Sequence, residues 1–343
     1  MKHVWTRILC LALFLSASGC SDYIGIELLR PGWLTSSAID INNSGVVICL
    51  EGGVGKYWSF IYRDGIYTRL QPPSGWITAY AAAINDNGDI VGQGAVSGNE
   101  IKLFIYNSGT YEILPPLLGW RSVEAYDINN KKVVVGYGKD SNGTGKAFIY
   151  SNGQYTVLLP PDALGSDVGV IPSINDHAEV VLTGRYNSGS RLFIYKEGEY
   201  LELKPPGVSV AWSAGISASG TVAIGGRDSN ENNKFKYFIY SNGEYTELIP
   251  PGLHEFYVAK INDNSAVLGY GIDDAGIYKW FIYDDNAYTI ATPPAILLGK
   301  DARINCFNNK GVVAGHSIQE IIPWLFYRQK GFVATPLFVK ISK

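Results

Sequence analysis

Residues 59–73 read SFIYRDGIYTRLQPP, and this stretch has the pattern of a β-hairpin. An aromatic and aliphatic run is followed by Asp64-Gly65, a pair that suits the positive φ of a tight hairpin turn, and then by a second alternating run. The stretch ends at Pro72-Pro73, which have no backbone N–H donors and therefore end strand pairing. Residues 59–73 thus predict the last two strands of a sheet.

The hairpin phrase recurs along the chain at a nearly constant period. Its first aromatic position, which is Leu in the last copy, aligns at spacings of 44, 44, 45, 45, 43 and 44 residues: Phe60, Phe104, Phe148, Phe193, Phe238, Phe281 and Leu325. A second phrase of the type AINDNGDIVG, which begins at Ala83, keeps step with the first and also occurs seven times. Seven units of nearly constant length indicate one architecture.

Each unit predicts four short strands. The first runs up to the Ile of Ile-Asn, and a turn such as residues 86–88 leads into the second, of the type Ile90-Val91-Gly92. The third is Phe-Ile-Tyr, and a tight turn opens the fourth. Four-stranded sheets of about 40–50 residues are typical of β-propellers, whereas the coils of an open solenoid are shorter and lack two reversing hairpins. We therefore expect an all-β chain that forms a seven-bladed β-propeller of four-stranded antiparallel blades.

An additional strand is predicted near the N-terminus. The segment 23–30, followed by Pro31-Gly32-Trp33, matches the end of a fourth strand and its linker, so eight candidate fourth strands exist for seven blades. The N-terminal strand either joins the last blade and closes the ring or adds an outer strand to that blade. Both arrangements are compatible with the sequence.

The first twenty residues have the pattern of an export signal. Lys2 and Arg7 precede an apolar run that is too short for a stable membrane-spanning helix, and small residues lead to Cys20. The ending Ala-Ser-Gly-Cys resembles a bacterial lipobox, which implies cleavage before Cys20 and acylation of that residue. We expect a signal peptide at 1–19, a lipid-anchored segment at 20–33 and one propeller domain at 34–343. Because Ser21 follows the cysteine where Asp would imply retention at the inner membrane, we expect the outer membrane.

The charge of the mature chain excludes one class of partner. Removal of Lys2 and Arg7 leaves 26 Lys and Arg against 31 Asp and Glu, a net charge of −5, without a basic run. Such a chain has no electrostatic footprint for nucleic acid. We expect a monomer whose partners are the membrane, through the lipid, and a protein or glycan ligand.

The two linked phrases resemble a known repeat. IN(D/N)xGxVVG followed by KAFIYSNGxYTxL, as in residues 146–158, is similar to the HAF repeat of bacterial exported proteins over roughly residues 34–337. The histidine of the family's His-Ala-Phe signature is absent from this chain. The resemblance implies an extracellular or surface location and brings no established activity.

The sequence offers no convincing catalytic or metal-binding motif. No nucleophile elbow, Walker loop or H-E-x-x-H occurs, and His177, His254 and His316 occupy three different repeat positions. The Asn of Ile-Asn recurs in six units, which favours a turn-capping role over catalysis. We expect a chain that is not an enzyme and has no cofactor and no metal.

Candidate ligand-binding residues are those that break the repeat at the approach to each first strand. Eight residues before the aligned Ile, the first three units have Trp33, Trp76 and Trp120. Four residues before this apolar position, the units have Ser37, Tyr80, Glu124, Val170, Trp212, Tyr257 and Arg303. Aromatic faces suit sugar rings and protein anchors, so these side chains predict a ligand face at the mouth of the channel. The alternative is that the tryptophans fill gaps between blades.

Two cysteines remain in the mature domain. Cys49 falls in the second strand of the first unit and Cys306 near the end of the first strand of the last unit, and ring closure makes these blades neighbours. An exported protein meets oxidising conditions, so a disulfide is possible, although facing sheets about 10 Å apart make its geometry demanding. Two separate buried thiols are the favoured alternative.

Three functions agree with these observations. The first is a non-catalytic binding scaffold on the cell envelope, and the second is a purely structural envelope component. The third is a polysaccharide-active enzyme, which would need two carboxylates about 5–9.5 Å apart in the channel. Asp40 and Asp127 occupy equivalent places in two units and are interpreted as structural.

Overall fold

The computed structural model describes residues 23–29, 34–53, 56–97, 100–166, 171–228, 231, 234–294, 301–322 and 326–336. The predicted signal peptide, Cys20 and Trp33 lie outside these residues. The described part of the chain forms strands and turns, and no segment of it is a helix long and apolar enough to cross a bilayer.

The strands form seven four-stranded antiparallel sheets. Blades 1 and 2 comprise β2 (Thr35–Ile41), β3 (Val47–Gly53), β4 (Lys56–Arg63) and β5 (Ile66–Arg69), then β6 (Tyr80–Ile84), β7 (Ile90–Ala95), β8 (Ile101–Asn107) and β9 (Thr110–Ile113). Blades 3 and 4 comprise β10 (Trp120–Ile128), β11 (Val134–Asp140), β12 (Gly145–Ser151) and β13 (Gln154–Leu158), then β14 (Ser173–Ile174), β15 (Val180–Tyr186), β16 (Gly189–Lys196) and β17 (Glu199–Leu203). Blades 5 and 6 comprise β18 (Val210–Ile216), β19 (Val222–Asp228), β20 (Lys234–Ser241) and β21 (Glu244–Glu247), then β22 (Leu253–Ile261), β23 (Val267–Asp273), β24 (Tyr278–Asp284) and β25 (Ala287–Ala291). Blade 7 comprises β26 (Asp301–Phe307), β27 (Val313–Ile322), β28 (Phe326–Pro336) and β1 (Tyr23–Leu28).

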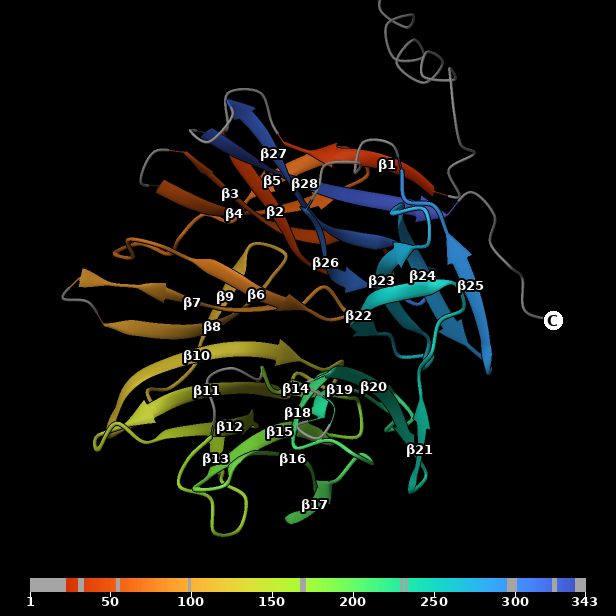
Figure 1. Cartoon of the computed structure of the whole chain (residues 1–343). Coiled ribbons are helices and arrows are strands. Elements are labelled where there is room, and N and C mark those ends of the chain that lie inside the picture. Colours follow the sequence, from red (N-terminus) through yellow and green to blue (C-terminus); the bar gives the residue numbers. More distant parts are fainter. Residues whose placement is uncertain are drawn as a thin grey trace, which may run out of the picture.

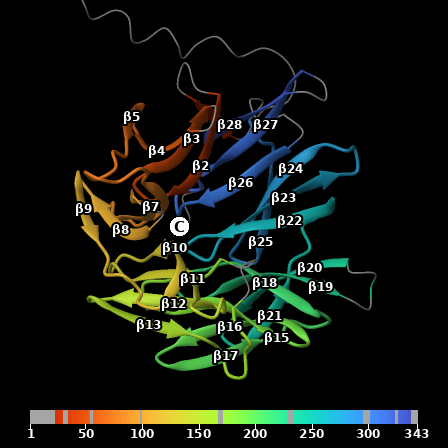
Figure 2. The same ribbon diagram turned by 90° about the vertical axis from the view of Figure 1, so that its left-hand side faces the viewer.

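The predicted seven-bladed β-propeller is confirmed. The sheets are arranged around a central axis, with the first strand of each blade innermost (Figures 1 and 2). The open question of ring closure is also answered: β1 pairs with β28 as the outermost strand of blade 7, from Tyr23 opposite Pro336 to Leu28 opposite Gly331. The last blade is therefore built from both ends of the described chain.

The hydrophobic core is divided among the seams between blades. Each pair of neighbouring blades shares an apolar cluster, and the Phe of the repeated phrase belongs to three of these clusters, at Phe148, Phe193 and Phe238. The equivalent Phe60, Phe104 and Phe281 are also buried. The repeated tyrosines connect strands within a blade and also connect neighbouring blades. In the third and fourth strands they pair at centroid distances of 4.9–5.1 Å in blades 1–6. The hydroxyl of Tyr111 then donates to the Gln71 carbonyl of the preceding blade at 2.7 Å.

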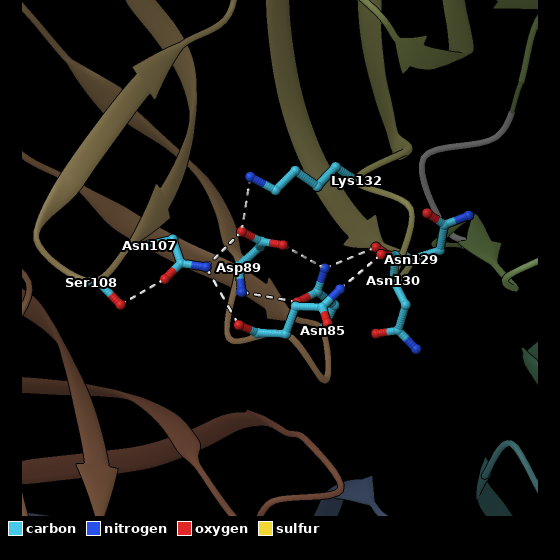
Figure 3. A network of polar contacts seen from close by, with 8 residues as sticks. Asn85, Asp89, Asn107, Ser108, Asn129, Asn130 and Lys132 are labelled. Carbon is cyan, nitrogen blue, oxygen red and sulfur yellow. Dashed lines mark hydrogen bonds and ion pairs between the residues drawn. The ribbon is translucent and has the colours of Figure 1, made fainter.

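The recurrent Asn caps its turn as expected, and its side chain also joins neighbouring blades. The Oδ1 of Asn129 accepts the N–H groups of Lys131 and Val133, while its Nδ2 donates to the Asn175 carbonyl of the next blade. Equivalent bonds of 2.9–3.2 Å, which include that from Asn85 to Asn129 (Figure 3), run around the ring from these donors: Asn42, Asn85, Asn129, Asn175, Asn262 and Asn308. The phrase that repeats therefore builds the ring.

Blade 5 interrupts this ring of amide bonds. Ser217 replaces the Asn, and a network of hydroxyl hydrogen bonds 2.9–3.3 Å long takes its place, formed by Ser217, Ser219, Thr221, Ser241 and Ser265. Because Ser265 belongs to blade 6 and donates to Ser217, the hydroxyls still connect the two blades. The seam between blades 5 and 6 is thus chemically distinct from the others.

Candidate functional site

The propeller has two different faces. One, which we call the linker face, carries the connections from each fourth strand to the next first strand and the loops between second and third strands. The other, which we call the turn face, carries the turns between first and second strands and between third and fourth strands. The predicted ligand residues that the structure describes precede their first strands or lie within the first five residues of them, so they belong to the linker-side half of the ring.

A central channel of about 700 Å³ runs between the innermost strands. Its walls come from all seven blades, and a β-bulge interrupts the described pairing of six first strands just before the Ile of Ile-Asn or its counterpart. The bulged strands present Asp40, Asp127 and Lys260 to the channel from blades 1, 3 and 6. They are the charged side chains that the first strands themselves contribute to the channel lining.

Asp40 and Asp127 each clamp two blades together. The Asp40 carboxylate accepts the N–H of Ile41 at 2.9 Å and that of Ile84, in the next blade, at 3.0 Å. Asp127 accepts the N–H of Ile128 at 2.8 Å and that of Ile174 at 3.0 Å. Burial raises the pKa of Asp40 to about 6, although Lys260 lowers it, and burial also raises the pKa of Asp127. Both oxygens of each carboxylate therefore have backbone donors.

The Asp40 carboxyl is expected to make stability depend on pH. Its pKa in the folded chain is about 6, above the ordinary 3.8, so its contribution is complete below pH 3.8 and is lost as the pH rises through 6. A shift of this size corresponds to at most about 3 kcal/mol, and contact with the channel reduces it to about 1–2 kcal/mol. We expect the free energy of unfolding of the wild type to fall by that amount, relative to Asp40→Ala, between pH 4 and 7.5.

Urea unfolding of both proteins at the two pH values measures this difference. Burial lowers the pKa of His316, which destabilises the fold as the pH falls, but this residue is present in both proteins and its effect cancels. Loss of the two accepted hydrogen bonds weakens Asp40→Ala at every pH. Equal pH dependence in the two proteins would contradict the assignment.

The turn-side mouth of the channel is lined by the amides of Asn43, Asn130 and Asn309 and the carboxylates of Asp86, Asp176 and Asp263. The residue after each recurrent Asn accepts hydrogen bonds from the equivalent residue of the preceding blade, as when Asp86 accepts from the N–H and Nδ2 of Asn43, both at 2.8 Å. Asp176 accepts in the same way from Asn130, and Asp263 accepts from Asn43 and Asn309. The three carboxylates at this mouth therefore accept hydrogen bonds from other blades. No group of three or more residues that could hold a metal ion occurs among the described residues.

Aromatic side chains are concentrated at the linker-side mouth over blades 5 and 6. Trp212 lies 5.9 Å from Phe235, Phe235 lies 5.8 Å from Tyr257, and Tyr257 lies 5.5 Å from Tyr270 between ring centroids. We call these four residues the aromatic arc. Phe235 and Tyr257 remain 37% and 42% exposed, and Trp212 lines the channel. The arc is therefore a contiguous aromatic surface that is accessible to a ligand.

Two arginines adjoin the arc. The Arg227 guanidinium lies 5.0 Å from the centroid of Phe235, within the range of a cation–π interaction. Burial raises the pKa of Tyr270, while the charge of the nearby Arg303 lowers it. The structure thus brings three of the predicted residues into one region: Trp212, Tyr257 and Arg303.

The other predicted residues do not join the arc. Trp76 and Trp120 are half-buried in blades 2 and 3, where each covers a glycine of its own second strand. A Cβ at Gly94 would lie 2.5 Å from the Trp76 ring, and a Cβ at Gly138 would lie 2.6 Å from the Trp120 ring. Each indole also meets the buried Phe of its blade edge to face. These tryptophans are packing residues with one partly accessible side.

Tyr80 and Glu124 lie on the linker-side half of blades 2 and 3. Tyr80 is half-buried at the start of β6. Glu124 is exposed and accepts a hydrogen bond of 2.8 Å from the hydroxyl of Tyr126, which lines the channel. A carboxylate is therefore placed on a different part of the mouth from the aromatic arc.

Phe235 and Tyr270 were missed by sequence reasoning, although the repeat contains their signal. The position three residues before the Phe of Phe-Ile-Tyr is aromatic at Tyr57, Phe235 and Tyr278 and is Ile, Gly or Ser at the others that the structure describes. Tyr270 occupies a second-strand position that is Tyr in blades 3 and 6 and differs in each of the other five units. Comparison of these two variable positions would have extended the predicted ligand face.

The possible disulfide is not formed in this structure. Cys49 and Cys306 are buried thiols in blades 1 and 7. The Cys49 Sγ contacts the Phe60 carbonyl at 3.5 Å, and the Cys306 Sγ contacts the Ala314 carbonyl at 3.6 Å. Each thiol is thus directed to a strand of its own sheet, and burial raises the pKa of Cys306.

No family model and no curated protein sequence matches the chain. Solved structures are similar in fold. Virginiamycin B lyase from Staphylococcus aureus has a TM-score of 0.53 at 14% identity, over 91% of this chain and 99% of that chain. The β-propeller domain of the Trilobed protease from Pyrococcus furiosus has a TM-score of 0.56 at 12% identity, over 91% and 100%. YCF48 bound to D1 peptide has a TM-score of 0.53 at 12% identity, over 95% and 99%. At such identities these similarities establish that the chain has the β-propeller fold.

Proposed function

We propose that this chain is a non-catalytic, lipid-anchored protein of the cell envelope whose propeller binds a protein or glycan ligand at the linker-side mouth. The aromatic arc is the observation that carries the proposal. Its rings form a continuous row, and two of them are exposed by more than a third, although apolar side chains of this size are usually buried.

The chemistry of the arc is that of a recognition surface. Tyrosine and tryptophan rings present large apolar faces at a low entropic cost, and arginine next to them is typical of the residues that dominate binding energies. YCF48, a propeller of similar fold, is bound to a peptide in its solved structure, so the fold is compatible with a peptide ligand.

The anchor is proposed from the sequence at Cys20. Small residues and Gly lead to this cysteine directly after an apolar run, and acylation there would supply about 0.8 kcal/mol for each buried methylene group. Ser21 in the next position favours the outer membrane. We propose a monomer that is held on the envelope by this lipid.

One observation supports a polysaccharide-active enzyme as a second candidate. Asp40 and Asp127 both face the channel with raised pKa values, and the charge of Asp127 contributes to the shift at Asp40. Raised carboxyl pKa values are a feature of glycosidase acids. However, both oxygens of each carboxylate accept backbone N–H bonds between blades, which accounts for their burial without catalysis. A purely structural envelope role is the remaining alternative.

The test is a binding screen of the soluble chain from Ser21 against a glycan panel and purified envelope proteins. We expect Tyr257→Ala to weaken binding of the ligand found by at least tenfold, since hot-spot aromatics contribute about 2 kcal/mol or more. Tyr57→Ala is the matched control, because Tyr57 is 50% exposed in blade 1, away from the arc.

Each outcome separates the candidate functions. Equal losses in Tyr257→Ala and Tyr57→Ala would place the ligand elsewhere, and absence of any ligand would favour the structural role. Release of reducing ends from a polysaccharide by the wild type, abolished in Asp127→Asn, would establish the enzyme instead.

A further inference from the structure

The exposed apolar side chains are distributed unequally over the surface. Among the residues that the structure describes, twenty large hydrophobic residues are exposed, and thirteen of them lie on the linker face: Leu34, Tyr57, Ile77, Ile101, Leu118, Leu164, Ile171, Val210, Phe235, Ile249, Tyr257, Ile272 and Ile277. The other seven lie on fourth strands at the perimeter, and none lies in the described turns of the turn face. The linker face is therefore the apolar face of the ring.

The turn face is polar and charged. Between third and fourth strands its turns contain pairs such as Asp64-Gly65 and Asn152-Gly153, and between first and second strands they contain exposed side chains such as Lys131 and Lys310. Such a surface remains hydrated and can lie beside lipid headgroups without inserting into the acyl region.

The described chain begins at the turn face. Tyr23 pairs with Pro336, the last residue of β28, and the ring of Pro336 lies beside Gly311 in a turn of that face. From there β1 runs to the linker face, where the chain continues to β2. A strand of six residues spans about 20 Å, so the start of β1 is about this far from the linker face.

We infer that the turn face of the propeller lies against the membrane and that the apolar linker face points away from it. The inference rests on the proposed acylation of Cys20. Only Ser21 and Asp22 separate Cys20 from Tyr23, and the three Cα–Cα steps from Cys20 to Tyr23 span at most about 11 Å. This tether is shorter than β1, so the lipid holds the turn side of blade 7 at the membrane. The aromatic arc is presented to ligands on the opposite side.

The test uses the lipidated full-length protein, incorporated in vesicles of phosphatidylethanolamine and phosphatidylglycerol. Lys310→Cys places a thiol on the turn face near the tether, and Leu118→Cys places one on the linker face, where Leu118 is 87% exposed. Cys49 and Cys306 are buried, so the introduced thiols are those that react. We expect a bulky polyethylene glycol maleimide to label Lys310→Cys several-fold more slowly in vesicles than in detergent. Leu118→Cys should be labelled at the same rate in both.

The outcomes separate orientation from anchoring. Slower labelling of Leu118→Cys in vesicles would mean that the apolar face docks on the lipid, and unchanged rates at both positions would mean that the tether does not hold the ring. Either result overturns the inference. Mass spectrometry of the N-terminal peptide reports acylation independently, and an unmodified Cys20 would overturn both the anchor and the orientation. Ligand binding by the aromatic arc, measured on the soluble chain, would remain unaffected.

Discussion

A chain that begins at Pro31 is expected to lose most of the stability of the chain that begins at Ser21. The shorter chain lacks β1, which is the fourth strand of blade 7, and so leaves the edge of β28 without a partner strand. An unpaired edge exposes backbone N–H and C=O groups and is a template for aggregation. We therefore expect both a lower free energy of unfolding and self-association.

The expected effect is large because β1 connects three blades. Tyr23 packs edge to face against Trp280 of blade 6 at a centroid distance of 5.2 Å. Leu28 is completely buried in the cluster that joins blade 7 to blade 1. Loss of one buried Leu side chain alone costs about 2–5 kcal/mol, and a typical domain is stable by only about 5–15 kcal/mol. Removal of both anchors should bring the ring close to unfolding at room temperature.

Urea unfolding and size-exclusion chromatography of the two chains measure this loss. A synthetic peptide of residues 21–30 should raise the unfolding midpoint of the shorter chain, because a strand can be added to a free edge in trans. A peptide of the same composition in scrambled order is the control. Equal unfolding midpoints for the two chains would show that β1 is dispensable for closure.

The fold was predictable because its signals are local and repeated. Residues 59–73 contain most of β4, the turn pair and all of β5, and a phrase repeated at a constant period leaves few alternatives to a ring. The last copy is the exception, because no turn divides β28: Phe332, which pairs with Gly315 as Phe148 pairs with Gly136, takes the place predicted for Leu325. Blade 4 shows a departure that the residues explain. Its first strand is only Ser173–Ile174, and Pro172, which cannot donate to the ladder, comes directly before it.

The bonds between blades were not predictable from one unit. The Nδ2 of Asn85 bonds to a residue 44 positions away, so its partner is known only when the packing of adjacent blades is known. Similarly, Asp40 accepts the N–H of Ile84 from a position beside a β-bulge. The alternation of apolar and polar residues does not reveal this bulge. Sequence reasoning predicted the turn cap that Asn85 forms and interpreted Asp40 as structural, but it did not identify the partners in the neighbouring blade.

The candidate ligand face was predicted in part. Trp212, Tyr257 and Arg303 were identified because they vary within an otherwise constant position, and the structure places them in one region. Phe235 completes the row from a different strand, which a search confined to the first strands could not include. Trp280 likewise contacts strands that are distant in the sequence, because its ring packs against Tyr23 of β1 and Phe332 of β28.

Trp280→Ala is expected to reduce the free energy of unfolding by about 3–5 kcal/mol, the range for removal of a buried Trp side chain. Trp280 is completely buried in blade 6, one residue before the Phe of the repeated phrase, where blades 1–5 have smaller side chains. Its ring contacts Tyr23 at 5.2 Å and stacks on Phe332 at 6.2 Å, so a cavity would open where both ends of the described chain meet.

Trp280→Phe is the matched control, because it keeps an aromatic ring in the cluster. The Trp280 Nε1 is buried, and no acceptor for it is present in the described part of the chain. Since an unsatisfied buried donor costs about 1–3 kcal/mol, the phenylalanine should recover most of the stability that alanine loses. Urea unfolding of the wild type and both variants gives the three free energies. If Phe is as destabilising as Ala, the indole is needed for more than packing, and its N–H must have a partner in solution.

A double-mutant cycle with Tyr23→Ala tests whether Trp280 acts through ring closure. An edge-to-face aromatic pair contributes about 0.5–1.5 kcal/mol beyond its buried area, so the two substitutions together should cost less than the sum of their separate effects by that amount. The unpaired control is Tyr126→Ala in blade 3, which should be additive with Trp280→Ala because the two residues share no cluster. If the effects of Tyr23→Ala and Trp280→Ala on the free energy of unfolding are additive, β1 closes the ring through its backbone pairing and Leu28 alone.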